Sequence, residues 1–122
     1  MPTTARHHTD APAAVVIDGI FRALSDPTRR DVVERLSVKP ASVSELAAPY
    51  RMALPSFLEH LKVLEGCGLV QSRKTGRVRT YALTPGRLKL AEDWLGQQRR
   101  LWERRLNQLD DYLLQLKKER ST

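Results

Sequence analysis

The stretch from Ser42 to Leu83 decides the fold, and it reads SVSELAAPYRMALPSFLEHLKVLEGCGLVQSRKTGRVRTYAL. Ser42 and Glu45 have the spacing of a capping box, in which each side chain binds a free backbone N–H at a helix start. Pro49 cannot continue a helix, because it lacks the N–H and its ring clashes with the preceding turn. This part of the stretch therefore predicts a short helix over residues 43–48.

The rest of the stretch predicts a second helix and a hairpin. Apolar residues three and four positions apart indicate a helix over residues 54–65. Alternating residues on either side of Thr75-Gly76 indicate two strands, over residues 69–74 and 77–83. Gly76 can adopt a positive φ at little cost, which suits a tight turn. The order is thus helix, turn, helix and hairpin.

Three further helices are expected outside this stretch. Apolar residues from Val16 to Leu24 recur on one helical face, and Asp26-Pro27 is a good N-cap and first position for a helix that runs to about Leu36. Thr84-Pro85 begins a long helix over residues 85–118. The expected fold class is mainly α with a small β-hairpin, a winged helix-turn-helix. Residues 1–12 are expected to be a flexible tail, 13–118 the domain and 119–122 a second tail.

The charge of the chain indicates a polyanionic partner. The 122 residues carry a formal net charge of +7, and 41% of them are hydrophobic, as in a globular protein. The segment 51–81 holds six basic and two acidic side chains. Nucleic acid, an acidic membrane surface or an acidic protein would suit this charge, and a merely solubilising role is the alternative. The clustering favours double-stranded DNA.

The remaining composition indicates a cytoplasmic protein. A single cysteine, Cys67, excludes an intramolecular disulfide and suits a reducing compartment. No apolar run approaches the roughly 20 residues needed to cross a bilayer, so no membrane contact is expected. Residues 1–12 are polar and lack the apolar core of a signal peptide. No nucleophile–base pair, acidic pair or phosphate-binding glycine loop indicates an enzyme.

Four side chains on the exposed side of the helix 54–65 are candidates for DNA contact, since an α-helix fits the major groove. Ser56 and His60 can each donate or accept at a base edge or a phosphate. Glu59 could accept from a cytosine amino group, and Lys62 suits a phosphate. The alternative for the helix is simple core packing, and for His60 a place at the edge of the core.

The hairpin tip gathers four basic residues, Arg73, Lys74, Arg77 and Arg79. Guanidinium groups bind phosphate oxygens with two-point geometry, so these residues could follow the DNA backbone or enter the minor groove. Such contacts position a protein on DNA without reading much sequence. A solvated turn is the alternative. Tyr81 is expected to pack inward from the second strand.

The helix 85–118 is long for so small a domain, and its apolar face needs a partner. Leu95, Trp102 and Leu109 recur every seven residues, and Leu106 and Leu113 widen the stripe. A second copy of the chain is the expected partner. The alternative function is a helical interaction module that binds another protein, with weak or no DNA binding.

Four runs together resemble the ArsR/SmtB family of winged-helix transcriptional repressors, over about residues 15–118. They are ALSDPTRRDVVERL, SVSELA, HLKVLEGCGLV and GRVRTYALTP. The run AEDWLGQQRRLWERRLNQLDDYL is similar to a subgroup with a long terminal helix. The resemblance implies a homodimer that represses its own operon from an inverted-repeat operator until an effector releases it.

The family pairs its first and last helices across the two-fold axis, and its DNA contacts would fall here on Ser56, His60 and the wing arginines. The implied dimer interface comprises Val16, Ile20, Leu95, Trp102, Leu106, Leu109 and Leu113.

Departures from the family pattern argue against metal sensing, so no metal and no cofactor is expected. The residues from Ser42 to Glu45 include no thiol where many members carry a cysteine pair, and no histidine follows His60. Cys67 alone is a poor metal site, because zinc sites use three or four ligands. The effector stays open: a small apolar molecule, a redox event at Cys67, a partner protein or none.

A second departure lies at the start of the helix 54–65. Ala53 occupies the cap position, where the family often has serine, so this helix should lack one cap and one phosphate contact. Leu58 and Glu59 also replace small polar and basic residues, which predicts a different sequence preference.

Overall fold

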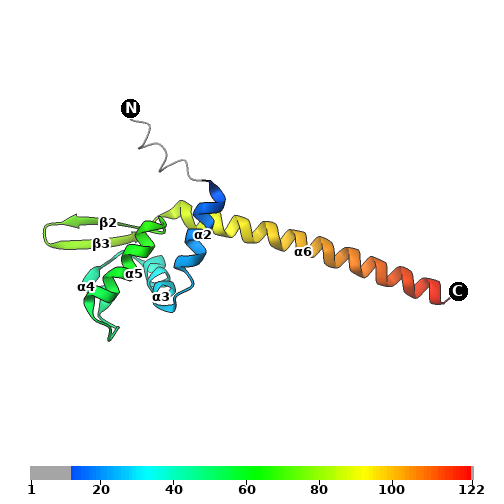
Figure 1. Cartoon of the computed structure of the whole chain (residues 1–122), viewed down its shortest axis with the longest axis horizontal. Coiled ribbons are helices and arrows are strands. Elements are labelled where there is room, and N and C mark those ends of the chain that lie inside the picture. Colours follow the sequence, from blue (N-terminus) through cyan, green and yellow to red (C-terminus); the bar gives the residue numbers. More distant parts are fainter. Residues whose placement is uncertain (1–11, 122) are drawn as a thin grey trace, which may run out of the picture. The chain divides into compact units, whose positions relative to one another are not determined.

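The computed structural model describes residues 12–121 and is mainly helical with one small sheet (Figure 1). The described chain forms two compact units, one up to Ala91 and the other from Glu92 onward. The elements in chain order are α2 (Ala13–Ala23), α3 (Pro27–Val38), β1 (Ala41–Ser42), α4 (Val43–Ala47), α5 (Leu54–Gly66), β2 (Val70–Thr75), β3 (Val78–Leu83) and α6 (Pro85–Arg120).

The sheet is antiparallel, with strand order β1-β3-β2. Ala41 pairs with Tyr81, and β2 pairs with β3 from Val70 opposite Leu83 to Thr75 opposite Val78. Only Gly76 and Arg77 remain in the turn, and Gly76 has a φ of 63°. A glycine with positive φ at the first of two turn positions is what a type II′ hairpin requires. The predicted hairpin is confirmed, and β1 is an addition to it.

The segment between α2 and α3 is fixed by its own polar side chains. Asp26 is the N-cap of α3, and its side chain accepts a hydrogen bond from the backbone N–H of Arg29 at 3.0 Å. Arg29 Nε donates to the carbonyl of Ala23 at 2.7 Å, and Arg30 Nη1 donates to that of Leu24 at 2.8 Å. The last carbonyls of α2 are thereby satisfied, as a helix end requires.

The short helix α4 is held from both ends. The predicted capping box of Ser42 and Glu45 is present at its start. At its end, the guanidinium of Arg35 donates to the carbonyls of Leu46 and Glu45 at 2.8 and 2.7 Å. Since Arg35 lies on α3, these two hydrogen bonds fix α4 against the helix before it.

The turn from α4 to α5 is anchored by Tyr50. Its ring packs on Phe57, with ring centroids 5.4 Å apart, and its hydroxyl donates to a carboxylate oxygen of Asp31. Tyr50 therefore links the turn both to α3 and to the first turn of α5.

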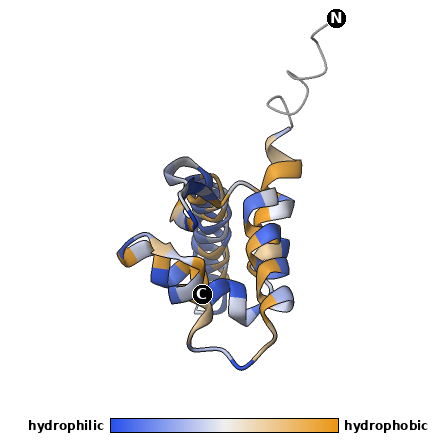
Figure 2. Ribbon diagram, turned by 90° about the vertical axis from the view of Figure 1, so that its left-hand side faces the viewer, coloured by the Kyte–Doolittle hydropathy of each residue, from blue (hydrophilic) through white to orange (hydrophobic). Residues whose placement is uncertain are grey.

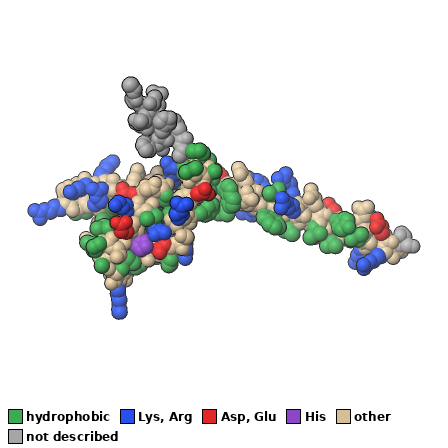
Figure 3. Space-filling model, viewed as in Figure 1, with side chains coloured by type: hydrophobic (Ala, Val, Ile, Leu, Met, Phe, Trp, Pro, Cys, Tyr) green, Lys and Arg blue, Asp and Glu red, His purple; other side chains and the backbone are tan. Residues whose placement is uncertain are grey.

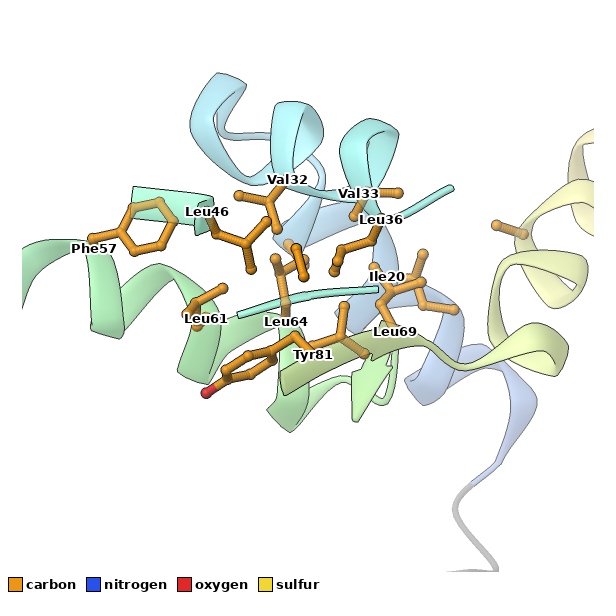
Figure 4. Close-up of a cluster of buried hydrophobic side chains, with 14 residues drawn as sticks. Ile20, Val32, Val33, Leu36, Leu46, Phe57, Leu61, Leu64, Leu69 and Tyr81 are labelled. Atoms are coloured by element: carbon orange, nitrogen blue, oxygen red, sulfur yellow. The ribbon is translucent and has the colours of Figure 1, made fainter. Parts of the chain in front are cut away.

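The core lies between the helices and the sheet (Figure 4). Val32, Val33 and Leu36 of α3 are buried. Ile20 is wholly buried at 0% exposure, and its side chain points into this cluster. Within the single chain, α2 thus packs the Ile20 side chain against its own domain, and a contribution of Ile20 to a dimer interface stays a prediction. The other large buried side chains are Leu46, Phe57, Leu61, Leu64, Leu69 and Tyr81.

Element boundaries differ from the predicted ones by a few residues. The helix α6 continues to Arg120, beyond the expected end at 118, and α3 continues to Val38. Leu54 has the spacing of the buried stripe of α5, but it is 52% exposed because it occupies the first position of the helix. Residues 1–11 of the expected tail lie outside the described residues. Pro12 is the N-cap residue of α2, which begins with an apolar run next to the grey trace in Figure 2.

Tyr50 gives the fold a testable dependence on alkaline pH. Burial, together with the hydrogen bond and charge of Asp31, raises the pKa of Tyr50 from 10.0 to about 12. A tyrosine with a raised folded pKa contributes stability that is complete below pH 10 and is lost as pH rises towards 12. Wild type should therefore lose more unfolding free energy than Tyr50→Phe between these two pH values.

Urea unfolding at several pH values measures this difference. Tyr112→Phe is the matched control, since Tyr112 is 60% exposed on α6. It should follow wild type, and equal losses in wild type and Tyr50→Phe would contradict the prediction.

Candidate nucleic-acid interface

The outward side of α5 carries three of the four predicted contact residues. Ser56, Glu59 and Lys62 are all exposed. Phe57, Leu61 and Leu64 are buried on the opposite side, so packing fixes which face of α5 looks outward. Glu59 lies between the Ser56 hydroxyl and the Lys62 ammonium on this face. Its negative charge lowers the attraction of the face for phosphate.

His60 lies at the edge of the buried stripe, and its side chain is 22% exposed. Its Nδ1 is 3.1 Å from Arg29 Nη1 and 3.7 Å from a carboxylate oxygen of Asp26. His60 is therefore tied to the start of α3 while part of its ring stays at the surface. Figure 3 shows a histidine at the surface among acidic and basic side chains.

The charges around His60 also act on Asp26. Burial alone would raise the pKa of this carboxyl, but the backbone N–H of Arg29 and the charges of His60 and Arg29 outweigh burial. The pKa of Asp26 is lowered as a result, so the carboxylate is the stable form beside Arg29.

The two ends of α5 differ. No side chain caps the first turn at Ala53, as the sequence predicted. At the other end the N–H of Gly68 donates to the carbonyl of Glu65, and the N–H of Leu69 to that of Leu64. This pair of bonds is a Schellman motif, which requires the positive φ of 80° that Gly68 adopts.

The hairpin places its basic residues on both faces of the sheet. Lys74 pairs with Arg79, and both continue the face that buries Tyr81 nearer the core. Arg73 pairs with Thr80 on the other face, and Arg77 lies in the turn. All four basic side chains are exposed, and Figure 3 shows basic side chains over the tip of the hairpin.

The base of the hairpin is bonded to α5. Arg79 Nη1 donates to Ser72 Oγ at 2.8 Å, and Ser72 Oγ donates to Glu65 Oε2 at 3.2 Å. Burial raises the pKa of Tyr81, and the nearby Glu65 raises it further. Arg79 thus serves the joint between the hairpin and α5, which leaves Arg73, Lys74 and Arg77 as the outer basic residues.

The long helix α6 exposes a continuous apolar stripe along its outer part. Trp102 is 59% exposed and Leu106 55%, and Arg105 lies over the Trp102 ring at 5.9 Å. Green apolar side chains recur along this helix in Figure 3. We name the stripe the α6 seam; its members are Leu95, Trp102, Leu106, Leu109, Leu113 and Leu116.

The other predicted interface residue, Val16, is half-buried against the core. It borders a hollow of about 900 Å³ that also takes in Gly19, Arg22, Cys67 and Arg87. Cys67 is half-buried there, and its thiol donates weakly to the carbonyl of Leu64 at 3.4 Å.

Within residues 12–121, no group of three or more His, Cys, Asp or Glu side chains could hold a metal ion. His7 and His8 lie outside the described residues. Over the same range, no helix is both long and apolar enough to span a membrane.

Sequence reasoning missed the role of Arg29. The run DPTRR indicates a cap and a helix start, whereas in the structure Arg29 also joins the end of α2 to His60. The periodicity of a helix shows that Arg29 is not a core residue. It does not show that the Arg29 side chain contacts His60, 31 positions later in the chain.

Comparison with known proteins identifies the fold. A helix-turn-helix domain family matches residues 24–73. The HTH-type transcriptional regulator Rv2034 of Mycobacterium tuberculosis is 44% identical over 68 residues, which cover 56% of this chain and 64% of that regulator. The chain thus spans less than two thirds of that relative's length. The transcriptional repressor SdpR of Bacillus subtilis is 25% identical over 79 residues, 65% of this chain and 88% of SdpR.

A solved structure described as an ArsR family transcriptional regulator superimposes with a TM-score of 0.71. It is 51% identical and covers 74% of this chain and 93% of its own. The mainly helical fold with a hairpin wing, predicted from the sequence, is confirmed by this match.

Proposed function

The chain belongs to the ArsR family of transcriptional regulators, and from this premise we propose that it is a homodimeric repressor of an inverted-repeat operator, and of its own promoter. Members of this family regulate transcription and are not enzymes. In the proposed complex each protomer places α5 in a major groove and the tip of its hairpin on the neighbouring backbone or minor groove. The proposed base or phosphate contacts are Ser56, His60, Glu59 and Lys62.

One observation carries the proposal. The helix α5 and the hairpin lie in the same compact unit and are joined by hydrogen bonds through Glu65, Ser72 and Arg79. The outward face of α5 and a set of exposed cations therefore belong to one compact part of the molecule. A groove-binding helix with a backbone-binding loop beside it is the arrangement that positions and reads duplex DNA.

A footprint on the protein's own promoter tests this proposal directly. We expect protection of two half-sites whose centres lie about one helical turn, or a multiple of it, apart. Affinity should fall steeply with salt, because bound cations displace counterions from phosphates. A random duplex of equal length is the control, and equal protection of both duplexes would contradict sequence-specific binding.

Glu59 gives a prediction of the opposite sign from the basic residues. Glu59→Gln removes a negative charge from the outward face of α5 and should raise affinity for random DNA by about two- to fivefold, since one exposed charge contact is worth about 0.2–1 kcal/mol. Glu34→Gln is the matched control, since Glu34 is exposed on α3. A mobility-shift titration measures both, and equal gains in the two variants would show that only net charge matters.

A further inference from the structure

We propose that Arg29 fixes the tautomer of His60, so that α5 presents the ring Nε2–H to DNA as a hydrogen-bond donor. Arg29 would then be a positioning residue for base recognition, although it lies on a different helix. This inference rests on the proposed function for its consequence in DNA binding. Its structural part concerns the free protein alone.

The donor and acceptor in the contact are determined by chemistry. A guanidinium has five N–H donors and no acceptor, so Arg29 Nη1 must donate to His60 Nδ1 across the 3.1 Å between them. Nδ1 must then carry a lone pair. In a neutral imidazole the proton is on the other nitrogen, so Nε2 carries it.

Arg29 is itself held in place. Its Nε donates to the carbonyl of Ala23 at 2.7 Å, and its backbone N–H donates to Asp26 at 3.0 Å. The guanidinium is thus fixed between the end of α2 and the start of α3. A fixed donor of this kind selects one state of its partner, whereas a mobile surface arginine would not.

Asp26 does not compete for the same ring nitrogen. Its carboxylate oxygen is 3.7 Å from Nδ1, which is longer than a hydrogen bond, and the same oxygen already accepts from the N–H of Arg29. Asp26 therefore balances the charge of Arg29 and leaves the Nδ1 lone pair to the guanidinium.

The Nε2 atom reaches solvent. Among the described residues that are not exposed, which include His60, no side-chain nitrogen or oxygen is both buried and without a hydrogen-bond partner. The ring contacts of His60 with Arg29 and Asp26 both involve Nδ1. Nε2–H is thus available to a base acceptor in the major groove, such as a purine N7, guanine O6 or thymine O4.

Nitrogen-15 NMR of the histidine ring in the free protein tests the tautomer. We expect the Nε2–H pattern for His60 at a mildly alkaline pH, assigned by its loss in His60→Ala. In Arg29→Met the nitrogen-15 chemical shifts of the two ring nitrogens should become more similar. Arg30→Met should keep the wild-type pattern, since Arg30 donates to a neighbouring carbonyl at the same helix end. An Nδ1–H pattern in wild type would overturn the proposal, and this result needs no variant to fold.

A double-mutant cycle on DNA tests the consequence. Arg29→Met and His60→Ala should each reduce the ratio of operator to random-DNA affinity by about three- to tenfold, the size of one hydrogen bond. Together they should reduce it no further, because both remove the same interaction. Additive losses, or no loss in His60→Ala, would overturn the proposal. If wild type binds no operator, the proposed function fails, and the NMR result still decides the tautomer.

Discussion

Leu106→Glu combined with Leu113→Glu should convert the protein to a monomer and lower operator affinity by about 100- to 10,000-fold. This range is the factor by which the affinity of two linked binding modules exceeds the affinity of one module alone. Trp102, Leu109 and these two leucines have the spacing of alternate core positions in a coiled coil. Four carboxylates in the seam of a dimer would have to be buried without partners, which proteins do not tolerate.

A matched control lies on the same helix. Gln108→Glu and Gln115→Glu add the same two charges per protomer, seven residues apart, on the side of α6 away from the seam. This variant should remain dimeric in sedimentation and should keep nearly all of its operator affinity. A leucine variant that stays dimeric would contradict the proposed interface. One that becomes monomeric without losing operator affinity would favour the α6 seam as a docking surface for another protein.

The second large effect is expected at the hairpin. Lys74→Ala with Arg77→Ala should weaken operator binding by about 10- to 100-fold, because a dimer loses four exposed charge contacts of roughly 0.5 kcal/mol each, about 2 kcal/mol in total. Operator and random DNA should be affected about equally, since phosphate contacts position a protein without reading sequence. The slope of log affinity against log salt should become shallower by about one for each phosphate that the variant no longer neutralises.

These two positions are better targets than Arg79. Because Arg79 donates to Ser72, its removal would loosen the joint with α5 as well as remove a charge. Lys118→Ala with Arg120→Ala is the control, with the same change of charge near the end of α6. If the control variant weakens binding as much as the hairpin variant, overall charge and not the hairpin would account for the effect.

Local patterns in the sequence were sufficient for most of the fold. Ser42 and Glu45 act on backbone groups three residues apart, and Asp26 does the same for α3, so both helix starts could be predicted directly. The hairpin could be predicted because its tight turn requires a positive φ, which Gly76 adopts easily. Each of these features is decided within a few residues, where the chemistry of one side chain limits the backbone.

Features that depend on distant residues could not be predicted in this way. The strand β1 has only two residues and exists because Ala41 and Ser42 lie beside β3, 38 or more positions later. Ile20 and Val16 share a helical face in the sequence, yet only Ile20 lies fully in the core. The contact of Arg29 with His60 joins two helices whose crossing no periodicity specifies. The candidate site was therefore predicted as a set of exposed residues, without the side chains that orient them.

The Schellman motif at Gly68 restricts insertions and deletions between α5 and β2. Between the last helical residue, Gly66, and the first strand residue, Val70, there are only three residues, and Leu69 among them is fully buried. An inserted or deleted residue here would turn the following strand over and present its buried side chains to water. We expect homologous chains to vary freely in the length of the hairpin tip but to keep this junction constant, so that the spacing between the two parts proposed to contact DNA stays the same among them.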